Sequence, residues 1–243
     1  DGTFPNHPAD PIQPENLRDL QARVLDTGAD VGLAFDGDAD RVFLVDERAR
    51  SVSGSTTTAL VARRVLQREP RATVLYNLIC SRAVPEVIAE NGGRAIRTRV
   101  GHSIIKQAMA EEGAAFAGEH SGHYYFRDNY RADSGLIAAL LVLEALSESD
   151  GPMSGLLAPY ERYAASGERN TAVGDPAAVI DRVAAHYADW PQDRLDGLTV
   201  DLGDWWFNVR PSNTEPLLRL NVEAADEATC QVRVAEVQAV VGQ

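Results

Sequence analysis

The stretch Val31-Gly-Leu-Ala-Phe-Asp36-Gly-Asp38-Ala-Asp40-Arg41 joins a short apolar run to three aspartates at alternate positions. The run over residues 31–35 has the length and composition of a buried β-strand. Side chains two residues apart point the same way in an extended backbone, so Asp36, Asp38 and Asp40 should converge. Three converging carboxylates repel one another unless a cation lies among them. The stretch therefore predicts a strand that ends at a divalent cation, and a few carboxylates with phosphate oxygens are typical of Mg²⁺.

Arg41 follows the aspartates directly, and a guanidinium in that place suits a phosphate group. Two other interpretations are open at this point. An EF-hand calcium loop would place the three aspartates and Glu47 at loop positions 1, 3, 5 and 12, but Arg41 then stands where that loop needs glycine. An aspartyl-phosphate phosphotransferase would use Asp36 as its nucleophile and Asp38 as its acid/base.

Composition limits the classes of function. The 243 residues carry a net charge of −13, which argues against nucleic-acid binding because that function needs a basic face. Lys106 is the only lysine, so nearly all positive charge is arginine, the better bidentate ligand for phosphate. Cys80 and Cys230 are too few for a disulfide scaffold and indicate a reducing compartment, so we expect a cytoplasmic protein. The sequence contains no signal peptide and no apolar run long enough to span a membrane, so we expect no membrane partner.

Apolar periodicity predicts strands and helices in alternation over the first two thirds of the chain. Strands are expected at 31–35, 42–45, 73–78 and 94–100, and helices at 15–27, 56–67, 83–90, from Gly101 onward, and from a cap at Asp133 or Ser134 to about Ser147. This alternation indicates an α/β architecture with a mixed sheet covered by helices.

The pattern changes after a break at 150–152 and a helical linker that reaches about residue 167. A strand, a helix over 176–187, two strands and a helix over 225–241 are expected there. This part reads as a separate, small α+β domain at the C-terminal end. Because the chain begins without methionine, in the proline-rich stretch 1–14, we expect it to be a piece of a longer protein.

Three further clusters carry polar side chains suited to chemistry. Gly118-Glu119-His-Ser121-Gly-His123 sets a carboxylate, a hydroxyl and imidazoles between glycines, which suits sugar hydroxyls or a polar structural turn. His102 follows Gly101 at a helix start and could accept a proton. In the stretch 210–219, Arg210 and Arg219 enclose Ser212, Asn213 and Thr214 in a proline-bounded loop, and these groups predict a phosphate cradle.

These stretches occur in the order and spacing of a known family. The sequences Asp36-Gly-Asp-Ala-Asp-Arg41, Gly118-Glu-His-Ser-Gly-His123 and Arg210-Pro-Ser-Asn-Thr-Glu-Pro216 resemble the metal, sugar and phosphate loops of the α-phosphohexomutases, the phosphomannomutase/phosphoglucomutase group, and of its bacterial members above all. The segments 4–7 and 100–106 also resemble family stretches, so the resemblance covers the whole chain.

The resemblance implies a protein of four domains. Residues 1–50 would be the end of the second domain with the metal loop, residues 51–163 the third domain with the sugar loop, and residues 164–243 the fourth, a lid with the phosphate loop. The N-terminal domains of the same protein would then be missing partners of this chain.

The resemblance also implies an activity. The family interconverts hexose 1-phosphate and hexose 6-phosphate through a phosphoserine and hexose 1,6-bisphosphate. By this resemblance the residues divide into three sets: Asp36, Asp38 and Asp40 as Mg²⁺ ligands with Arg41 beside them as a catalytic residue, Glu119, Ser121 and His123 at the sugar, and Arg210, Ser212, Asn213, Thr214 and Arg219 at the phosphate that is not transferred.

Two departures from the family pattern stand out. The loop Thr-Ala-Ser-His-Asn-Pro is absent, so the catalytic serine is expected outside this chain, which would be inactive alone. Relatives often carry a lysine near 77–82, where this chain offers only Arg82, and our first choice for the acid/base is therefore His102. A non-catalytic fragment that binds sugar phosphates is the alternative.

Overall fold

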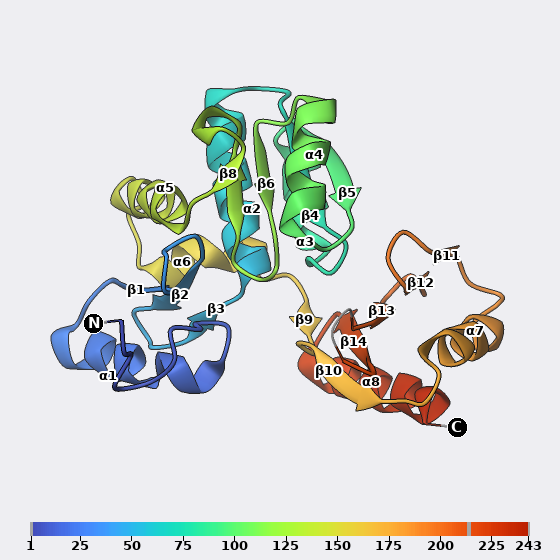
Figure 1. Ribbon diagram of the computed structural model, residues 1–243. Helices are drawn as coiled ribbons and strands as arrows, with labels where there is room; N and C mark the ends of the chain where they lie inside the picture. The colour runs from blue at the N-terminus through green and yellow to red at the C-terminus, as the bar shows by residue number, and fades with distance from the viewer. Residues whose placement is uncertain (1, 213–214, 243) are drawn as a thin grey trace. The chain divides into compact units, whose positions relative to one another are not determined.

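The protein consists of two compact units, Asp1–Glu161 and Arg162–Gln243, in a computed structural model that describes residues 2–212 and 215–242 (Figure 1). No helix in these two ranges is long and apolar enough to cross a membrane. Each unit has its own hydrophobic core, and the two free cysteines, Cys80 and Cys230, are both buried. The units are therefore described one at a time.

The first unit begins with a small antiparallel sheet and its covering helix. The elements are η1 (Pro14–Leu17), α1 (Arg18–Thr27), β1 (Val31–Phe35), β2 (Val42–Asp46) and β3 (Ser51–Val52), with strand order β1-β2-β3. Helix α1 is followed by Gly28, whose left-handed φ of 63° favours glycine. Strand β2 is buried throughout, whereas β1 lies at the sheet edge and is only partly buried, because just one of its sides is paired.

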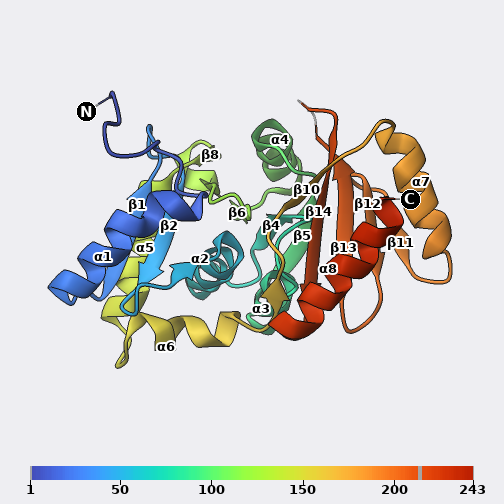
Figure 2. The same cartoon turned by 90° about the horizontal axis from the view of Figure 1, so that it is seen from below.

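A five-stranded mixed sheet with the order β5-β4-β6-β7-β8 forms the rest of the first unit. Its strands are β4 (Thr73–Asn77), β5 (Arg94–Thr98), β6 (Phe116–Gly118), β7 (Tyr124–Phe126) and β8 (Ala132–Asp133). The helices are α2 (Gly54–Arg68), α3 (Ala83–Glu90), α4 (His102–Glu112), α5 (Gly135–Ser147) and α6 (Met153–Leu157), with short 3₁₀ turns η2 (Arg127–Asn129) and η3 (Ala158–Tyr160). Figure 2 shows α4 on one face of this sheet and α2 on the other.

The two faces of the five-stranded sheet pack on different cores. Val74, Phe116 and Tyr124 belong to the main core with α2, while Leu75 and Tyr125 pack with Ile105 and Met109 of α4, among other residues. Side chains alternate between the faces of a strand, so the adjacent Tyr124 and Tyr125 point to opposite sides. This alternation places the tyrosyl group of Tyr125 on the side of α4.

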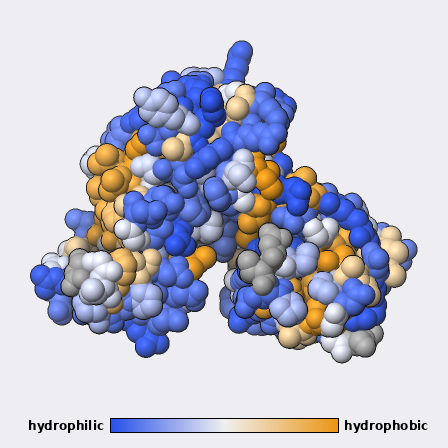
Figure 3. Space-filling model, in the orientation of Figure 1, coloured by the Kyte–Doolittle hydropathy of each residue, from blue (hydrophilic) through white to orange (hydrophobic). Residues whose placement is uncertain are grey.

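Helix α5 is apolar on its outer side as well as its inner side. Leu136, Leu140 and Leu143 are exposed at helical spacing, and Figure 3 shows apolar surface in the region of α5. The helix begins at Ser134, whose hydroxyl accepts the N–H of Ile137. Of the two residues predicted as this cap, Ser134 is the one that serves.

The second unit is a sheet covered on one face by two helices. Its strands are β9 (Ala164–Ala165), β10 (Arg169–Ala172), β11 (Gln192–Asp193), β12 (Leu198–Asp201), β13 (Trp206–Pro211) and β14 (Leu217–Ala224), and its helices are α7 (Pro176–His186) and α8 (Glu227–Val241). The strand order is β10-β14-β13-β12-β11, and β9 pairs with β14. Phe207, Val209 and Leu220 face the helices, so Arg210 and Arg219 lie on the opposite face.

The predicted fold class is confirmed, since a mixed α/β unit precedes a small α+β unit. The predicted helices and strands of the first unit occur within a few residues of their expected ends. The second unit has more strands than the two expected after α7, because short β11 and the long β14 gave no distinct pattern. A domain boundary near residue 50 stays a prediction.

A glycine at the start of α5 sets how closely this helix approaches the aspartate loop. A Cβ on Gly135 would lie 2.5 Å from the carbonyl oxygen of Arg41, whereas a Cβ on Gly151 would meet nothing within 4 Å. We expect Gly135→Ala to lower the free energy of unfolding by about 1–3 kcal/mol, since the contacted atom is backbone and cannot move aside alone. Urea unfolding of both variants tests this. An equal effect of Gly151→Ala would show that the close approach does not matter.

Candidate active site

The aspartate loop connects two antiparallel strands. It follows β1 and returns into β2, so the flanks are strands and the EF-hand interpretation, which needs helices, is wrong. Ala39 adopts a left-handed φ of 62°, and its N–H donates to the carbonyl of Asp36 at 3.3 Å. This tight turn folds the loop back on itself.

The carboxylates of Asp36, Asp38 and Asp40 converge as predicted, with one oxygen of each within 4.8 Å of the others. Arg41 binds Asp36 through two groups. Its Nε lies 2.7 Å from Oδ2 of Asp36, and its backbone N–H donates to Oδ1 of Asp36 at 3.1 Å. Burial would raise the pKa of Asp36, but these bonds to Arg41 lower it. Burial and the neighbouring Asp36 raise the pKa of Asp40 to about 6.

This donor set fits a hard divalent cation. Oδ1 of Asp40 is buried and accepts no hydrogen bond from the described residues; its nearest cationic nitrogens are Nδ1 of His123 at 3.8 Å and Nε of Arg41 at 4.0 Å. A buried carboxylate oxygen without a donor is costly, and a cation would remove that cost. Mg²⁺ commonly takes one or two protein carboxylates and completes its shell with water and phosphate oxygens.

The aspartate loop is joined to the predicted sugar loop by backbone contacts. Arg41 forms an isolated antiparallel bridge with His123, and the N–H of Val42 donates to the carbonyl of Gly122 at 3.2 Å. Gly122 has a φ of 86°, and a Cβ there would lie 2.6 Å from the ring of Phe43, so only glycine fits. Two loops some eighty residues apart in the sequence thus form one site in the first unit.

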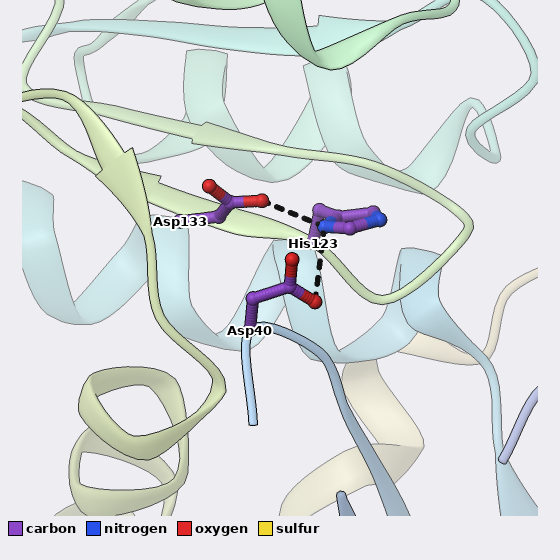
Figure 4. Close-up of side chains that lie close together, drawn as sticks. All are labelled: Asp40, His123 and Asp133. Atoms are coloured by element: carbon purple, nitrogen blue, oxygen red, sulfur yellow. Dashed lines mark hydrogen bonds and ion pairs between the residues drawn. The ribbon is translucent and has the colours of Figure 1, made fainter. Parts of the chain in front are cut away.

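His123 is fixed between two carboxylates, as Figure 4 shows. Its Nδ1 lies 2.8 Å from Oδ2 of Asp133 and 3.8 Å from Oδ1 of Asp40. Burial would lower the pKa of His123, but the bond to Asp133 and the charges of Glu119 and Asp40 raise it. Burial would likewise raise the pKa of Asp133, but His123 and Lys106 hold it well below its usual range. Asp133 is therefore an acceptor, and Nδ1 of His123 donates to it.

Glu119 is buried at the start of a turn and is already hydrogen-bonded. Its Oε1 accepts from the hydroxyl of Tyr125 at 2.6 Å and its Oε2 from Nδ2 of Asn77 at 3.1 Å. The turn closes through the N–H of Gly122, which donates to the carbonyl of Glu119 at 3.1 Å. Ser121 lies in this turn and is partly exposed. A carboxylate oxygen has two lone pairs, so Glu119 can still accept from a ligand hydroxyl.

The structure places His102 apart from this bonded set. It is the first residue of α4 and is exposed, after Gly101 with a φ of 134°. One helical turn later, Nζ of Lys106 lies 2.9 Å from Oδ1 of Asp133. Lys106 thus contacts the bonded set through Asp133, one helical turn after His102.

In the second unit the predicted phosphate loop is shorter than expected. Arg210 and Arg219 lie directly opposite each other on β13 and β14, and the turn between these strands follows Pro211. Asn213 and Thr214 lie outside the described residues. Ser212 lies at the turn, where its hydroxyl is 3.3 Å from Nη2 of Arg219.

Both arginines share one carboxylate. Glu168 accepts from Nη2 of Arg210 at 2.7 Å and pairs with Nη1 of Arg219 at 3.3 Å. Burial lowers the pKa of Arg210, and the nearby Arg219 adds to this effect. The Nε atoms of both arginines are buried and donate to no described residue. The expectation that Arg210 lies in a loop is wrong, because this residue belongs to β13 and its side chain is buried.

Several residues of these clusters were given no role in the site on the basis of sequence. They are Asn77, Lys106, Tyr125, Asp133 and Glu168. Asn77 and Tyr125 lie inside apolar strands and read as core, while Asp133 was assigned only a capping role. The role of these residues in the site depends on which strands pair with one another. The apolar periodicity of a single strand does not show that pairing.

Comparison with known proteins identifies three domains. Residues 1–51 match the phosphoglucomutase/phosphomannomutase alpha/beta/alpha domain II, residues 53–163 match alpha/beta/alpha domain III, and residues 168–240 match the C-terminal domain. The phosphomannomutase of Methanocaldococcus jannaschii is 41% identical over 98% of this chain and 53% of its own length. That of Escherichia coli K12 is 39% identical over 92% of this chain and 50% of its own.

The comparison with solved structures indicates the same family. A phosphoglucomutase/phosphomannomutase family protein from Burkholderia thailandensis superimposes with a TM-score of 0.89 at 33% identity, covering 99% of this chain and 52% of that one. The Aspergillus fumigatus N-acetylphosphoglucosamine mutase, in complex with GlcNAc-6P and magnesium, reaches 0.65 at 17% identity over 86% of this chain and 48% of its own. The chain spans about half the length of the curated relatives it matches. It belongs to the phosphoglucomutase/phosphomannomutase family.

Proposed function

We propose that this chain supplies the metal-, sugar- and phosphate-binding residues of a phosphohexomutase that interconverts hexose 1-phosphate and hexose 6-phosphate. The observation that carries the proposal is the joining of the aspartate loop to the sugar loop through the Arg41–His123 bridge. A cation site and a hydroxyl-binding turn on one face suit a reaction that moves a phosphoryl group on a sugar.

Asp36, Asp38 and Asp40 would hold Mg²⁺, the ion present in the Aspergillus fumigatus relative. When bound, Mg²⁺ would neutralise negative charge on the transferring phosphoryl group. Arg41 keeps Asp36 ionised and oriented through its two hydrogen bonds, and its Nη1 also lies 3.3 Å from Oδ1 of Asp10. In the proposed reaction this guanidinium would lie beside the transferring phosphoryl group.

The sugar would be held by the turn at residues 119–123. Glu119 offers the free lone pairs of a fixed carboxylate, and Ser121 offers a hydroxyl at the partly exposed rim. His123 donates from Nδ1 to Asp133, so its other ring nitrogen points away from both carboxylates and can bond a substrate hydroxyl (Figure 4). Two histidines are therefore candidates for exchanging the hydroxyl proton, the exposed His102 and the fixed His123.

The second unit would bind phosphate. Arg210 and Arg219 together carry two positive charges against the single charge of Glu168, and each has a buried Nε donor that no described residue uses. A phosphate oxygen suits such donors. Ser212, and by resemblance Asn213 and Thr214, would complete this site.

The proposed cycle needs a phosphoserine that carries the phosphoryl group while the sugar reorients. No serine of residues 1–243 lies in the family's Thr-Ala-Ser-His-Asn-Pro loop. The donor would therefore come from a segment outside these residues, and hexose 1,6-bisphosphate would be the intermediate.

The first prediction concerns the cation. Asp38→Asn should weaken Mg²⁺ or Mn²⁺ binding by about tenfold or more, since even changes beyond the direct ligands cost that much. Asp26→Asn, on the exposed side of α1, is the matched control and should bind as the unaltered chain does. Calorimetric titration measures both. Equal affinities for the two variants would remove the aspartate loop from the metal site.

The second prediction concerns the phosphate-binding arginines. Arg210→Ala should lower hexose phosphate affinity about tenfold or more, because a hydrogen bond to a charged group contributes roughly 1.5–3 kcal/mol. It should also lower the unfolding midpoint, since it removes a buried partner of Glu168. Arg194→Ala, which removes an exposed ion pair with Asp181, is the control. Titration and thermal unfolding measure the two effects. Unchanged affinity in Arg210→Ala would exclude this cluster.

The third prediction is that residues 1–243 alone do not isomerise hexose phosphates. Positioning and charge stabilisation accelerate transfer only when a group is present to carry the phosphoryl. Mannose 1-phosphate with Mg²⁺ and hexose 1,6-bisphosphate should give no 6-phosphate, whereas a protein extended upstream through a serine loop should give it. Sustained turnover by the 243 residues would point to another nucleophile, and Asp36→Asn would test the aspartyl-phosphate alternative first.

A further inference from the structure

We propose that Lys106 is a positioning residue that fixes two groups of the sugar site at once, the imidazole of His123 and the carboxylate of Glu119. The part of this inference that concerns substrate rests on the function proposed above. The part that concerns the two side chains rests on contacts within the first unit alone.

One arm runs through Asp133. Nζ of Lys106 lies 2.9 Å from Oδ1 of Asp133, and the other oxygen, Oδ2, accepts from Nδ1 of His123 at 2.8 Å. The Asp133 side chain is only 10% exposed, so both of its oxygens depend on these protein donors. With both oxygens engaged, the carboxylate cannot rotate, and the ring of His123 keeps Nδ1 on Asp133.

The other arm runs through Tyr125. Nζ of Lys106 lies 5.6 Å from the centre of the Tyr125 ring, within the range of a cation–π contact. The hydroxyl of that ring donates to Oε1 of Glu119 at 2.6 Å, and the ring also stacks on His123 at 6.1 Å. The ammonium group of Lys106 therefore restrains the ring of Tyr125, and the hydroxyl of this ring orients Glu119.

The fold explains why one side chain reaches both arms. Tyr125 points toward α4 because side chains alternate along β7, and Lys106 follows the buried Ile105 on that helix. Asp133 is paired with Tyr125 across β7 and β8, so its carboxylate lies next to the same ring. Lys106, Tyr125 and Asp133 thus come from one helix and two neighbouring strands, and the two groups that they fix, Glu119 and His123, lie in the turn before β7.

The burial of the partners separates this contact from an ordinary surface ion pair. Lys106 itself is 39% exposed, and an exposed lysine pair usually contributes little to stability. Loss of Lys106, however, would leave Oδ1 of the buried Asp133 carboxylate without its side-chain donor. We therefore expect a lower unfolding midpoint as well as a change in the geometry of His123 and in ligand affinity.

Three variants and one control test the inference on the 243-residue chain. Lys106→Met removes the charge and keeps an unbranched side chain, Lys106→Arg restores a cation, and Asp133→Asn weakens the acceptor. The control is Arg94→Met, which removes an exposed cation that pairs with Glu112 on the same unit. Thermal unfolding first establishes that each variant is folded.

The first readout is the histidine ring in long-range ¹H–¹⁵N spectra, which need no substrate. Five histidines give few signals, and His123→Asn assigns the one required. Lys106→Met and Asp133→Asn should both shift the ring nitrogens of His123, whereas Lys106→Arg and Arg94→Met should leave them near the original positions. If Lys106→Met is unfolded, Lys106→Gln, which also removes the charge, supplies the same comparison. Unshifted His123 signals in the folded lysine variant that lacks the charge would overturn the inference, whatever Asp133→Asn shows.

The second readout is binding of mannose 1-phosphate in the presence of Mg²⁺, measured by calorimetry. Lys106→Met should lose about tenfold in affinity, and Lys106→Arg should regain most of it. If the unaltered chain does not bind this ligand, the proposed function fails, while the histidine spectra still decide the role of Lys106. If the unaltered chain binds and Lys106→Met binds equally well, the positioning role is wrong.

Discussion

Mutual repulsion among the carboxylates of Asp36, Asp38 and Asp40 is the constraint that shapes the first unit. Burial first, and then the neighbouring Asp36, raise the pKa of Asp40, so the neutral form of this carboxyl group is favoured. Arg41 offsets this repulsion by binding Asp36, and the imidazole of His123, with Nδ1 3.8 Å from Oδ1 of Asp40, offsets it at Asp40. The loop keeps its shape through its own contacts between Arg41 and Asp36 and through backbone hydrogen bonds to Gly122 and Gly135.

The second unit also brings side chains of like charge together, but there the charges are positive. Arg210 and Arg219 face each other across two paired strands and would repel without an anion, and Glu168 lies between them. An incoming phosphate would meet arginines already ordered by a carboxylate. Such ordering reduces the entropy lost when a ligand binds, although the carboxylate also competes for the same donors.

Much of this arrangement could be predicted from sequence and part of it could not. The aspartates at alternate positions predicted their own convergence, and apolar periodicity located the helices of the first unit. Asp133 could be seen only as a possible helix cap, because its partners Lys106 and His123 are set by strand pairing. Arg210 was expected in a loop because proline follows it, yet its pairing with Arg219 extends the strand to Pro211.

The alternation along β7 has a consequence for how this chain can change over evolutionary time. Tyr124 packs in the main core and Tyr125 serves the polar site, so two adjacent residues belong to the two sides of one sheet. Losing or gaining a single residue within β7 would change which face of the sheet its tyrosines meet, so that the site tyrosine would turn into the core and the core tyrosine toward α4. Single substitutions in this strand can be tolerated, but the insertion or deletion of one residue cannot. Insertions and deletions among relatives should therefore collect elsewhere, in exposed turns that no strand register constrains.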